Sequence, residues 1–258
     1  MSQPHAEWSE FLPAYDLPTY AGTSRAYLIA TTQRTGSHFL AHLLAADGSL
    51  GVPFEYLNSH RMWLELEARR WPHDELSEVR LLEEMIARRT GSSGWFGLKA
   101  HWHTWAAAQS RPDISKLVVP ERVIYLSRGD ALAQGVSLAI AEQTGVWVNS
   151  GDVRHTSPAY DAVLIEDALR RVEAEKDAWE TFIRSWPGDV LRVTYEELVG
   201  APGDVVGRIF DYFAVQPAEQ LRDLPPLSPS PDLYLREWAE RYTSERQANC
   251  DDGATRVS

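Results

Sequence analysis

The stretch Ala26-Tyr-Leu-Ile-Ala-Thr-Thr-Gln-Arg-Thr-Gly-Ser-His-Phe-Leu40 decides the fold of this chain. Its first residues form an apolar run typical of a buried strand, and the residues from Phe39 onward are typical of a helix. The polar loop between them carries Arg34, Gly36 and Ser37 and lies where the helix begins. The N–H groups of a first helical turn have no partner within the helix and bind anions. The stretch therefore predicts a site for a phosphate or a sulfate group.

The loop lacks the signature of ATP- and GTP-binding proteins. The Gly-x-x-x-x-Gly-Lys-Ser/Thr spacing and its lysine are absent, and the cation is Arg34, placed before the glycine. A glycine and a serine between a strand and a helix are also ordinary turn and capping residues. Taken alone, the loop leaves open whether it binds an anion or only turns the chain.

A second segment repeats this arrangement. Residues Arg122–Ser127 are typical of a strand, and Asp130 is placed to cap the helix that follows. Arg128 then lies at the carboxyl end of the strand, and Ser137 lies about two turns along the helix. An arginine fork and a hydroxyl placed in this way can hold a second phosphate.

Two strand-to-helix anion sites without a nucleoside-triphosphate motif resemble the sulfotransferases that use 3′-phosphoadenylyl sulfate (PAPS). In that family the first loop holds the 5′-phosphosulfate group, and an arginine and a serine further along hold the 3′-phosphate. The resemblance implies the P-loop-NTPase-like sulfotransferase fold, with PAPS as the sulfuryl donor. It makes candidates for cofactor binding of Gln33, Arg34, Thr35, Gly36, Ser37, His38, Arg128 and Ser137.

The similarity is closer to the Stf0-like branch of that family. The branch has Gln-Arg-Ser-Gly-Ser at the loop, then Gly-x-Pro-x-Glu-aromatic, then Gln-x-Val-Ser followed by Gln-Thr and a tryptophan. This chain has Gly51-Val-Pro-Phe-Glu55-Tyr56, Gln134-Gly-Val-Ser137 and Gln143-Thr-Gly-Val-Trp147 in the same order. One position departs from the family. The residue after the loop serine is usually a hydroxyl residue and is His38 here, whose imidazole can still donate a hydrogen bond to an anion.

Sulfuryl transfer requires a base for the acceptor hydroxyl and charge stabilisation at the leaving phosphate. The resemblance gives two candidate bases: Glu55, at the position of the glutamate proposed as base in the Stf0-like branch, and His101, in a Lys-x-His segment similar to that of the cytosolic sulfotransferases. The branch motifs favour Glu55, and we expect partial burial to raise its pKa toward the useful range. Arg34 and the loop N–H groups suit the leaving side. Lys99 is a further candidate there, although a solvent-facing lysine explains that position equally well.

Aromatic residues near the expected site suggest an acceptor surface. The chain has ten tryptophans, and aromatic side chains at a sheet edge can form a wall for a sugar. We take Trp102 and Trp147, together with Glu55 and Tyr56, as candidates for substrate binding. The resemblance implies an acceptor hydroxyl on a carbohydrate, a glycolipid or a small natural product, and the sequence does not identify the acceptor itself.

The order of elements predicts an α/β chain with a mostly parallel sheet covered on both faces, a three-layer αβα sandwich. In such a sheet, ligands bind beyond the carboxyl ends of the strands, where both loops lie. We expect one sulfotransferase domain over residues 1–258, with an N-terminal extension (1–22), a Pro-rich loop (217–231) and a flexible tail (247–258). The predicted strands are Tyr27–Ala30, Phe96–Ala100, Val123–Leu126 and Val190–Val193, and the predicted later helices are Tyr160–Trp186 and Leu235–Tyr242.

Composition limits the cellular compartment and the classes of binding partner that we expect. The formal net charge of −12 disfavours nucleic acids and anionic membranes, so local arginines must attract an anionic cofactor. One cysteine excludes an internal disulfide framework, and the chain has neither a leader-like start nor a long apolar run, so we expect it in the cytoplasm. No metal site is indicated, because His101 and His103 have no further ligands at a recognisable spacing. The resembled family includes symmetric dimers, which leaves a homodimer open.

Three classes of function remain. A PAPS-dependent sulfotransferase is favoured. A nucleotide-dependent kinase of related fold is disfavoured by the missing lysine. A non-catalytic nucleotide-binding module is the third, and it would lose no activity on substitution of Glu55 or His101.

Overall fold

A parallel sheet forms the centre of the molecule. The computed structural model describes residues 13–58, 77–147, 157–224 and 234–255. Within them the strands are all parallel and lie in the order β2-β1-β3-β4. Their bounds are β1 (Arg25–Thr31), β2 (Trp95–Ala100), β3 (Pro120–Ser127) and β4 (Val190–Thr194). The four strands predicted from the sequence are therefore confirmed, with slightly wider bounds.

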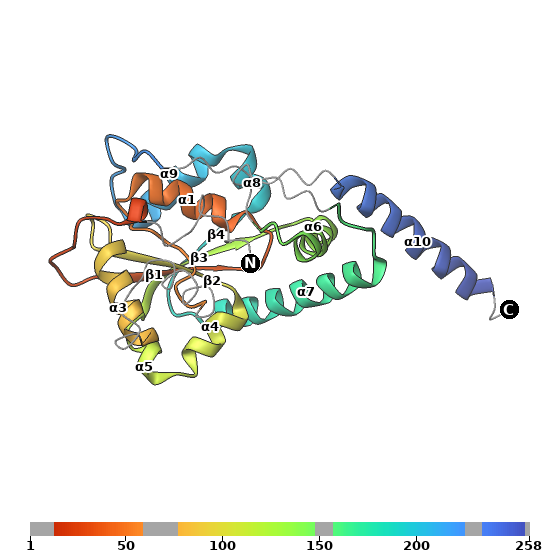
Figure 1. The fold of residues 1–258 in the computed structure, drawn as a ribbon, viewed down its shortest axis with the longest axis horizontal. Coiled ribbons are helices and arrows are strands. Elements are labelled where there is room, and N and C mark those ends of the chain that lie inside the picture. Colours follow the sequence, from red (N-terminus) through yellow and green to blue (C-terminus); the bar gives the residue numbers. More distant parts are fainter. Residues whose placement is uncertain (1–12, 59–76, 148–156, 225–233, 256–258) are drawn as a thin grey trace, which may run out of the picture.

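Side chains of β1 point alternately into two apolar cores, because successive residues of a strand face opposite sides of a sheet. Leu28 and Ala30 pack on one side, and Tyr27 and Ile29 pack on the other, all fully buried. Helices cover both sides, so the predicted α/β sandwich of three layers is confirmed (Figure 1). The first side is covered by α3 (Glu78–Arg89), α4 (Trp102–Gln109) and α7 (Ala162–Ser185), and the second by α1 (Ser37–Asp47), α8 (Tyr195–Gly200) and α9 (Pro202–Phe213).

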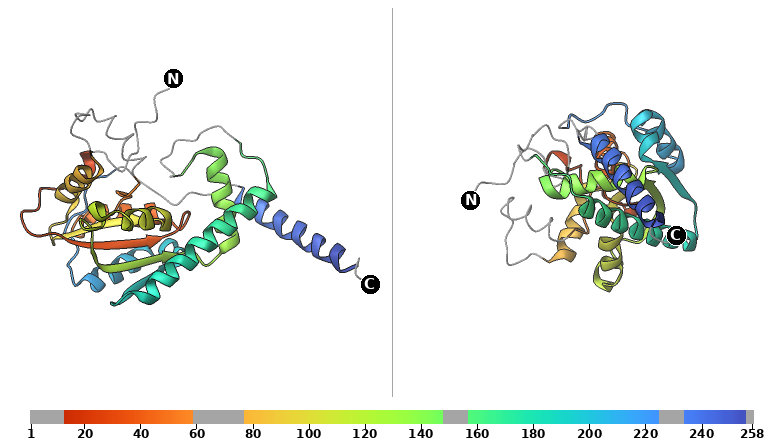
Figure 2. Two further views of the ribbon diagram at one scale, coloured as in Figure 1. Left: turned by 90° about the horizontal axis from the view of Figure 1, so that it is seen from below. Right: turned by 90° about the vertical axis from the view of Figure 1, so that its right-hand side faces the viewer.

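A third apolar cluster joins α7 to α6 (Ala131–Thr144) and α10 (Leu235–Thr255). Trp238 and Tyr242 anchor the first half of α10 in this cluster. The second half of the helix projects from the body of the molecule (Figure 2). Part of the predicted flexible tail at 247–258 is therefore helical.

The start of the described chain packs against the domain. Tyr15 is fully buried in the first core, and Nη2 of Arg222 donates a hydrogen bond to the carbonyl of Ala14 at 2.6 Å. Arg222 belongs to the predicted Pro-rich loop (217–231), which has no helix or strand up to residue 224 and then lies outside the described residues. The short elements are η1 (Pro13–Tyr15) and α5 (Pro112–Ser115).

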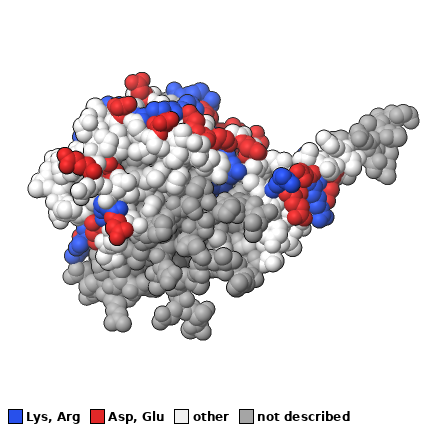
Figure 3. Space-filling model, turned by 90° about the horizontal axis from the view of Figure 1, so that it is seen from above, with Lys and Arg blue, Asp and Glu red and all other residues white. Residues whose placement is uncertain are grey.

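The charged side chains are mixed in sign on the face shown in Figure 3. Lysines and arginines alternate there with acidic residues, including on α10, and the described residues form no continuous basic patch on this face. Within the described part of the chain, no helix combines the length and the apolarity that crossing a bilayer requires.

All the described strands end at one edge of the sheet because they are parallel. The residues that directly follow β1, β2, β3 and β4 therefore lie at this edge. α1 begins at this edge after Gly36, and α6 begins there with the predicted cap Asp130, whose side chain accepts a hydrogen bond from the N–H of Ala133 at 2.8 Å. Both predicted anion sites thus lie at the same edge.

The segment 51–58 runs beside β2 and reaches the same edge. Phe54 pairs with Leu98 as a parallel bridge, and the N–H of Lys99 donates to the carbonyl of Phe54 at 2.9 Å. This pairing places Glu55, the next residue, beside the end of β2.

Gly51 makes this path possible. Its φ is 81°, a conformation that residues with a side chain rarely adopt. A Cβ atom added there would lie 2.5 Å from the carbonyl oxygen of Arg89 and 2.7 Å from that of Trp95. A side chain at this position would therefore displace the segment that carries Glu55.

We predict that Gly51→Ala lowers the free energy of unfolding by about 2 kcal/mol or more, because left-handed backbone strain and a clash with backbone atoms add. Gly207→Ala is the matched control. Gly207 lies within α9 with open space around its Cα, so alanine there is expected to raise the free energy of unfolding by about 0.5–1 kcal/mol. Urea unfolding of both variants measures the two changes. Equal effects at the two glycines would contradict the prediction.

Candidate functional site

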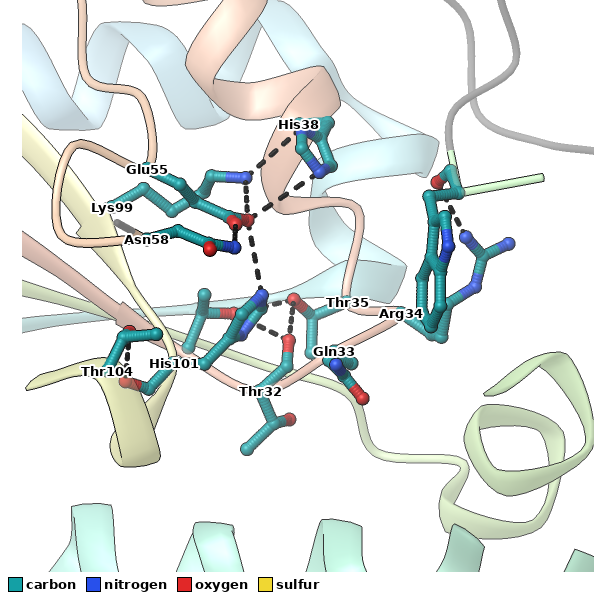
Figure 4. A network of polar contacts seen from close by, with 12 residues as sticks. Thr32, Gln33, Arg34, Thr35, His38, Glu55, Asn58, Lys99, His101 and Thr104 are labelled. Atoms are coloured by element: carbon teal, nitrogen blue, oxygen red, sulfur yellow. Dashed lines mark hydrogen bonds and ion pairs between the residues drawn. The ribbon is translucent and has the colours of Figure 1, made fainter. Parts of the chain in front are cut away.

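The carboxylate of Glu55 is the centre of a polar cluster at the strand edge (Figure 4). Its Oε1 atom lies 2.7 Å from Nζ of Lys99, 3.2 Å from Nε2 of His101 and 3.6 Å from Nε2 of His38. Glu55, Lys99 and His101 are 6%, 0% and 8% exposed. The structure therefore brings both candidate bases and the candidate lysine together in one buried cluster.

The neighbours of Glu55 fix its charge. Burial by itself raises the pKa of this carboxyl, but the Lys99 ammonium and the hydrogen bond with His101 outweigh burial and hold the pKa well below its usual value. The expectation of a raised pKa for Glu55 is therefore wrong: burial acts in that direction, but the net shift is downward. Lys99 explains the difference, because it is not the solvent-facing lysine that the sequence left open: it is fully buried and donates to Glu55.

The contact with Glu55 also fixes the tautomer of His101. An ionised carboxylate only accepts hydrogen bonds, so Nε2 of a neutral His101 carries the proton and Nδ1 holds a lone pair. This Nδ1 atom is buried and has no hydrogen-bond partner among the described residues. The ring of His103 stacks on the ring of His101, with ring centres 6.0 Å apart. Nδ1 of His103 is not a hydrogen-bond partner of Nδ1 of His101, because it pairs with Glu175 at 2.7 Å, and this hydrogen bond raises the pKa of His103. Nδ1 of His101 is therefore a buried acceptor whose lone pair has no donor among the described residues.

Hydroxyl and amide groups hold the loop after β1. Oγ1 of Thr31 and Oγ1 of Thr35 lie 2.6 Å apart, and the Thr35 hydroxyl donates to the carbonyl of Thr32 at 3.0 Å. Nε2 of Gln134, from α6, donates to Oγ1 of Thr32 at 2.8 Å and to the carbonyl of Gln33 at 2.5 Å. The side chain of Thr35, a predicted donor-site residue, is thus engaged within the loop, and its N–H is the group it can offer to an anion.

The start of α1 has the geometry that the Gly36-Ser37 part of the loop motif predicts. Gly36 has a φ of 75°, and a Cβ atom there would lie 2.9 Å from Cδ2 of Tyr195. Ser37 is the first residue of the helix and is buried. Tyr195 begins α8 directly after β4, and its ring also lies under Arg128, with the guanidinium carbon 4.3 Å from the ring centre. This tyrosine connects the two predicted anion sites.

Arg34 turns toward the second anion site. Its φ of 63° is uncommon for a residue with a side chain. Its Nε donates to Oγ of Ser137 at 2.8 Å and its Nη1 donates to the carbonyl of Trp147 at 2.7 Å. The side chain points away from the Glu55 cluster in Figure 4. Arg34 and Ser137, which the resemblance assigns to different phosphates, therefore contact each other.

Arg128 lies after the end of β3 and faces the loop after β1. Its Nη1 donates to the carbonyl of Arg34 at 3.2 Å, and its Nε is buried without a hydrogen-bond partner among the described residues. Lys176 donates to the carbonyl of Arg128 at 3.1 Å, and Glu196 accepts from the N–H of Gly129 at 3.1 Å, so the backbone here is held on both sides. A buried guanidinium N–H without an acceptor fits an anionic oxygen, so the residues present suit the predicted phosphate.

The sequence analysis missed three residues of the site: Gln134, Tyr195 and Glu196. Gln134 belongs to a quoted motif but received no role, since its contact with the loop joins segments far apart in the chain. A signal existed for Tyr195 and Glu196. They directly follow a predicted strand, so in a parallel sheet they reach the same edge as the two anion loops.

Of two predicted substrate residues, Tyr56 lies in the apolar core and Trp102 is partly buried against it. Tyr56 is 1% exposed, and its hydroxyl donates to the carbonyl of Val52 at 2.6 Å. Trp102 packs edge-on against Trp179, with ring centres 5.1 Å apart. Both of these contacts are therefore with the core, and a role of the two side chains in acceptor binding stays a prediction. Trp147 is 40% exposed and stays available for an acceptor.

The comparisons with known proteins agree with this geometry. The family described as Stf0 sulphotransferase matches residues 26–245. The chain belongs to this family. It is therefore a sulfotransferase, as the resemblance implied.

Two curated proteins and one solved structure are similar to this chain. It is 28% identical over 260 residues to trehalose 2-sulfotransferase of Mycolicibacterium smegmatis, covering 86% of this chain and 96% of that protein. It is 27% identical over 259 residues to trehalose 2-sulfotransferase of Mycobacterium tuberculosis, covering 86% and 95%. A solved sulfotransferase domain from the curacin biosynthetic pathway is similar at 17% identity and a TM-score of 0.47, over 75% of both chains.

We predict that Glu55→Gln lowers the free energy of unfolding by about 3–5 kcal/mol at neutral pH, because Lys99 loses its counter-charge in the interior. The folded-state pKa of Glu55 lies below its unfolded value, so its ionisation stabilises the protein above about pH 5 and this contribution is lost as pH falls through the folded pKa. The difference in free energy of unfolding between wild type and Glu55→Gln is therefore expected to become smaller in acid. Urea unfolding across pH measures it.

Glu121→Gln is the control for that series. Glu121 pairs with Arg25 at 2.8 Å, but both side chains are about half exposed, so the loss is expected to stay below about 1 kcal/mol. A similar loss in the two variants, or a gap that does not depend on pH, would show that the Glu55 pair is not a buried ionised pair.

Proposed function

We propose that this sulfotransferase moves a sulfuryl group from PAPS to a hydroxyl of a carbohydrate, with glycolipids and small natural products as further acceptors of the same chemistry. The observation that carries the proposal is the meeting of two elements at one sheet edge: the anion loop at the start of α1 and the buried cluster of Glu55, Lys99 and His101. The names of the two trehalose 2-sulfotransferases support a sugar as acceptor.

The donor half of the proposal uses the two anion sites. The N–H groups of the loop and Ser37 face the 5′-phosphosulfate, and Arg128 faces the 3′-phosphate with its open Nε. Arg34 leaves its contacts with Ser137 and Trp147 to stabilise the leaving phosphate. The described residues contain no group of three or more His, Cys, Asp or Glu arranged to hold a metal ion.

The acceptor half uses the cluster. Glu55 stays ionised and orients His101, and Nδ1 of His101 takes the proton of the acceptor hydroxyl. The hydroxyl oxygen forms its bond to sulfur as the bond between sulfur and the bridging oxygen breaks, and the electron pair stays on the leaving phosphate. The proton stays on His101, whose positive charge then lies against Glu55. Glu55 and His101 thus act as a pair, although the motifs favoured Glu55 as the base.

A nucleotide-dependent kinase and a non-catalytic module are not favoured. The family match covers the loop and the cluster, and a buried, compensated Glu55 with an open imidazole nitrogen would serve no purpose in a pure nucleotide binder. The cytoplasmic location and the homodimer stay predictions.

The direct test is transfer of radiolabelled sulfur from PAPS to a panel of sugars that begins with trehalose. We expect label in a sugar and release of an equal amount of adenosine 3′,5′-bisphosphate. His101→Ala is expected to lower kcat/KM by about 10²–10⁴-fold, the usual contribution of a general base. Phosphate transfer from ATP, with none of sulfur from PAPS, would contradict the proposal and favour the kinase.

We predict that Arg128→Ala weakens binding of adenosine 3′,5′-bisphosphate by about 10–100-fold and leaves binding of adenosine 5′-phosphate nearly unchanged, because the guanidinium would contact only the extra phosphate. Arg122→Ala is the matched control. Arg122, like Arg128, lies over a tyrosine ring, that of Tyr212 at 4.7 Å, but it lies near the start of β3 and away from the loops at the carboxyl edge. Calorimetric titration measures both nucleotides. Equal losses for both in Arg128→Ala would remove Arg128 from the 3′-phosphate site.

A further inference from the structure

His38 connects the donor loop to the Glu55 cluster. It lies in the first turn of α1, directly after the loop serine. Its Nδ1 lies 3.1 Å from Nζ of Lys99, and its Nε2 lies 3.6 Å from Oε1 of Glu55. Figure 4 shows the ring directed at this pair. The sequence analysis took His38 as a donor-binding residue, but both ring nitrogens face the proton-transfer side of the site.

The contact with Lys99 determines the protonation of His38. An ammonium group only donates hydrogen bonds, so Nδ1 of His38 must offer a lone pair and the proton lies on Nε2, toward Glu55. A second proton on the ring would place two cations 3.1 Å apart and remove the acceptor for Lys99. The positive end of the α1 dipole also disfavours a charged ring in the first turn. The neutral ring is therefore the form that holds Lys99.

We infer that His38 is a positioning residue: its neutral imidazole holds the Lys99 ammonium between Glu55 and the start of α1, where the lysine can stabilise charge on the transferring group. The inference rests on the proposed function. It gives His38 a role in the rate of transfer and a small role in the affinity for the donor.

Charged and titratable groups face His38 from two other elements. Lys99 faces it from β2, and Glu55 faces it from the segment 51–58. His101 faces the same Glu55 oxygen at 3.2 Å. On α1 itself, His42 lies one turn further, 3.4 Å from the Tyr15 hydroxyl, and burial lowers its pKa. His38 and His101 are therefore the two imidazoles that face the Glu55 carboxylate.

The first test compares His38→Asn with His38→Leu. Asparagine keeps an acceptor near the place of Nδ1 and does not titrate, whereas leucine keeps the bulk and removes the acceptor. We expect leucine to lower kcat by about 10–100-fold and asparagine to restore most of the loss. Binding of adenosine 3′,5′-bisphosphate is expected to change less than about threefold in both. Equal kcat losses in the two variants, or loss of bisphosphate binding with unchanged kcat, would overturn the inference.

The pH profile of kcat is the readout that a merely structural role would not move. In acid, kcat of His38→Asn is expected to fall less steeply with pH than kcat of the wild type, because a protonated His38 can no longer accept a hydrogen bond from Lys99 whereas asparagine does not titrate. His42→Asn, on the same helix, is the control and should keep the wild-type slope. An unchanged slope in His38→Asn would overturn the inference.

A second measurement does not depend on activity. In protein with isotope-labelled histidine, long-range nitrogen–proton NMR reports which ring nitrogen carries the proton, with the His38→Asn spectrum giving the assignment. We expect Nε2–H for His38, and a changed Nδ1 signal in Lys99→Met. Protonated Nδ1 would overturn the inference even if the protein transfers sulfur. The expected tautomer without any transfer would instead count against the proposed function alone.

Discussion

The buried ion pair between Glu55 and Lys99 is the interaction on which the site depends. A carboxylate in the protein interior is costly unless a cation and further donors compensate it, and Lys99 at 2.7 Å supplies the cation. The pair exists because the segment after Gly51 runs along β2. It keeps Glu55 ionised, and an ionised Glu55 determines which nitrogen of His101 is free to accept a proton. The chemistry of the cluster follows from that one contact.

The donor loop and the Glu55 cluster must attract an anionic donor with local groups, because the net charge of the protein does not help. The protein is acidic, with a formal charge of −12, so its overall field repels an anionic donor. The compensation is local. α1 and α6 begin at the same edge, Arg128 lies between them over Tyr195, and His38 extends from the donor loop to Lys99. A shift of the donor loop would therefore move His38, in the first turn of α1, and with it the contact to Lys99.

The sequence predicts what is local and misses what depends on contacts between distant segments. Apolar runs and capping residues predict the strands, the Asp130 cap and the loops at one edge. Glu55 and Lys99 are 44 residues apart, so neither the burial of the lysine nor the lowered pKa of the glutamate follows from a motif. The burial of Tyr56 is a second example. An aromatic residue beside a candidate base suggests an acceptor contact, but only the folded chain shows that its ring is in the core.

Calorimetric titration of the purified protein with adenosine 3′,5′-bisphosphate, beside ADP and ATP at the same salt concentration, tests the central claim most directly. The account predicts that the bisphosphate binds at least about tenfold more tightly than either comparison, since the 3′-phosphate adds a charge-assisted contact with Arg128. Preference for ATP would contradict the account, because the loop at Arg34 and the cluster around Glu55 would then serve phosphate transfer.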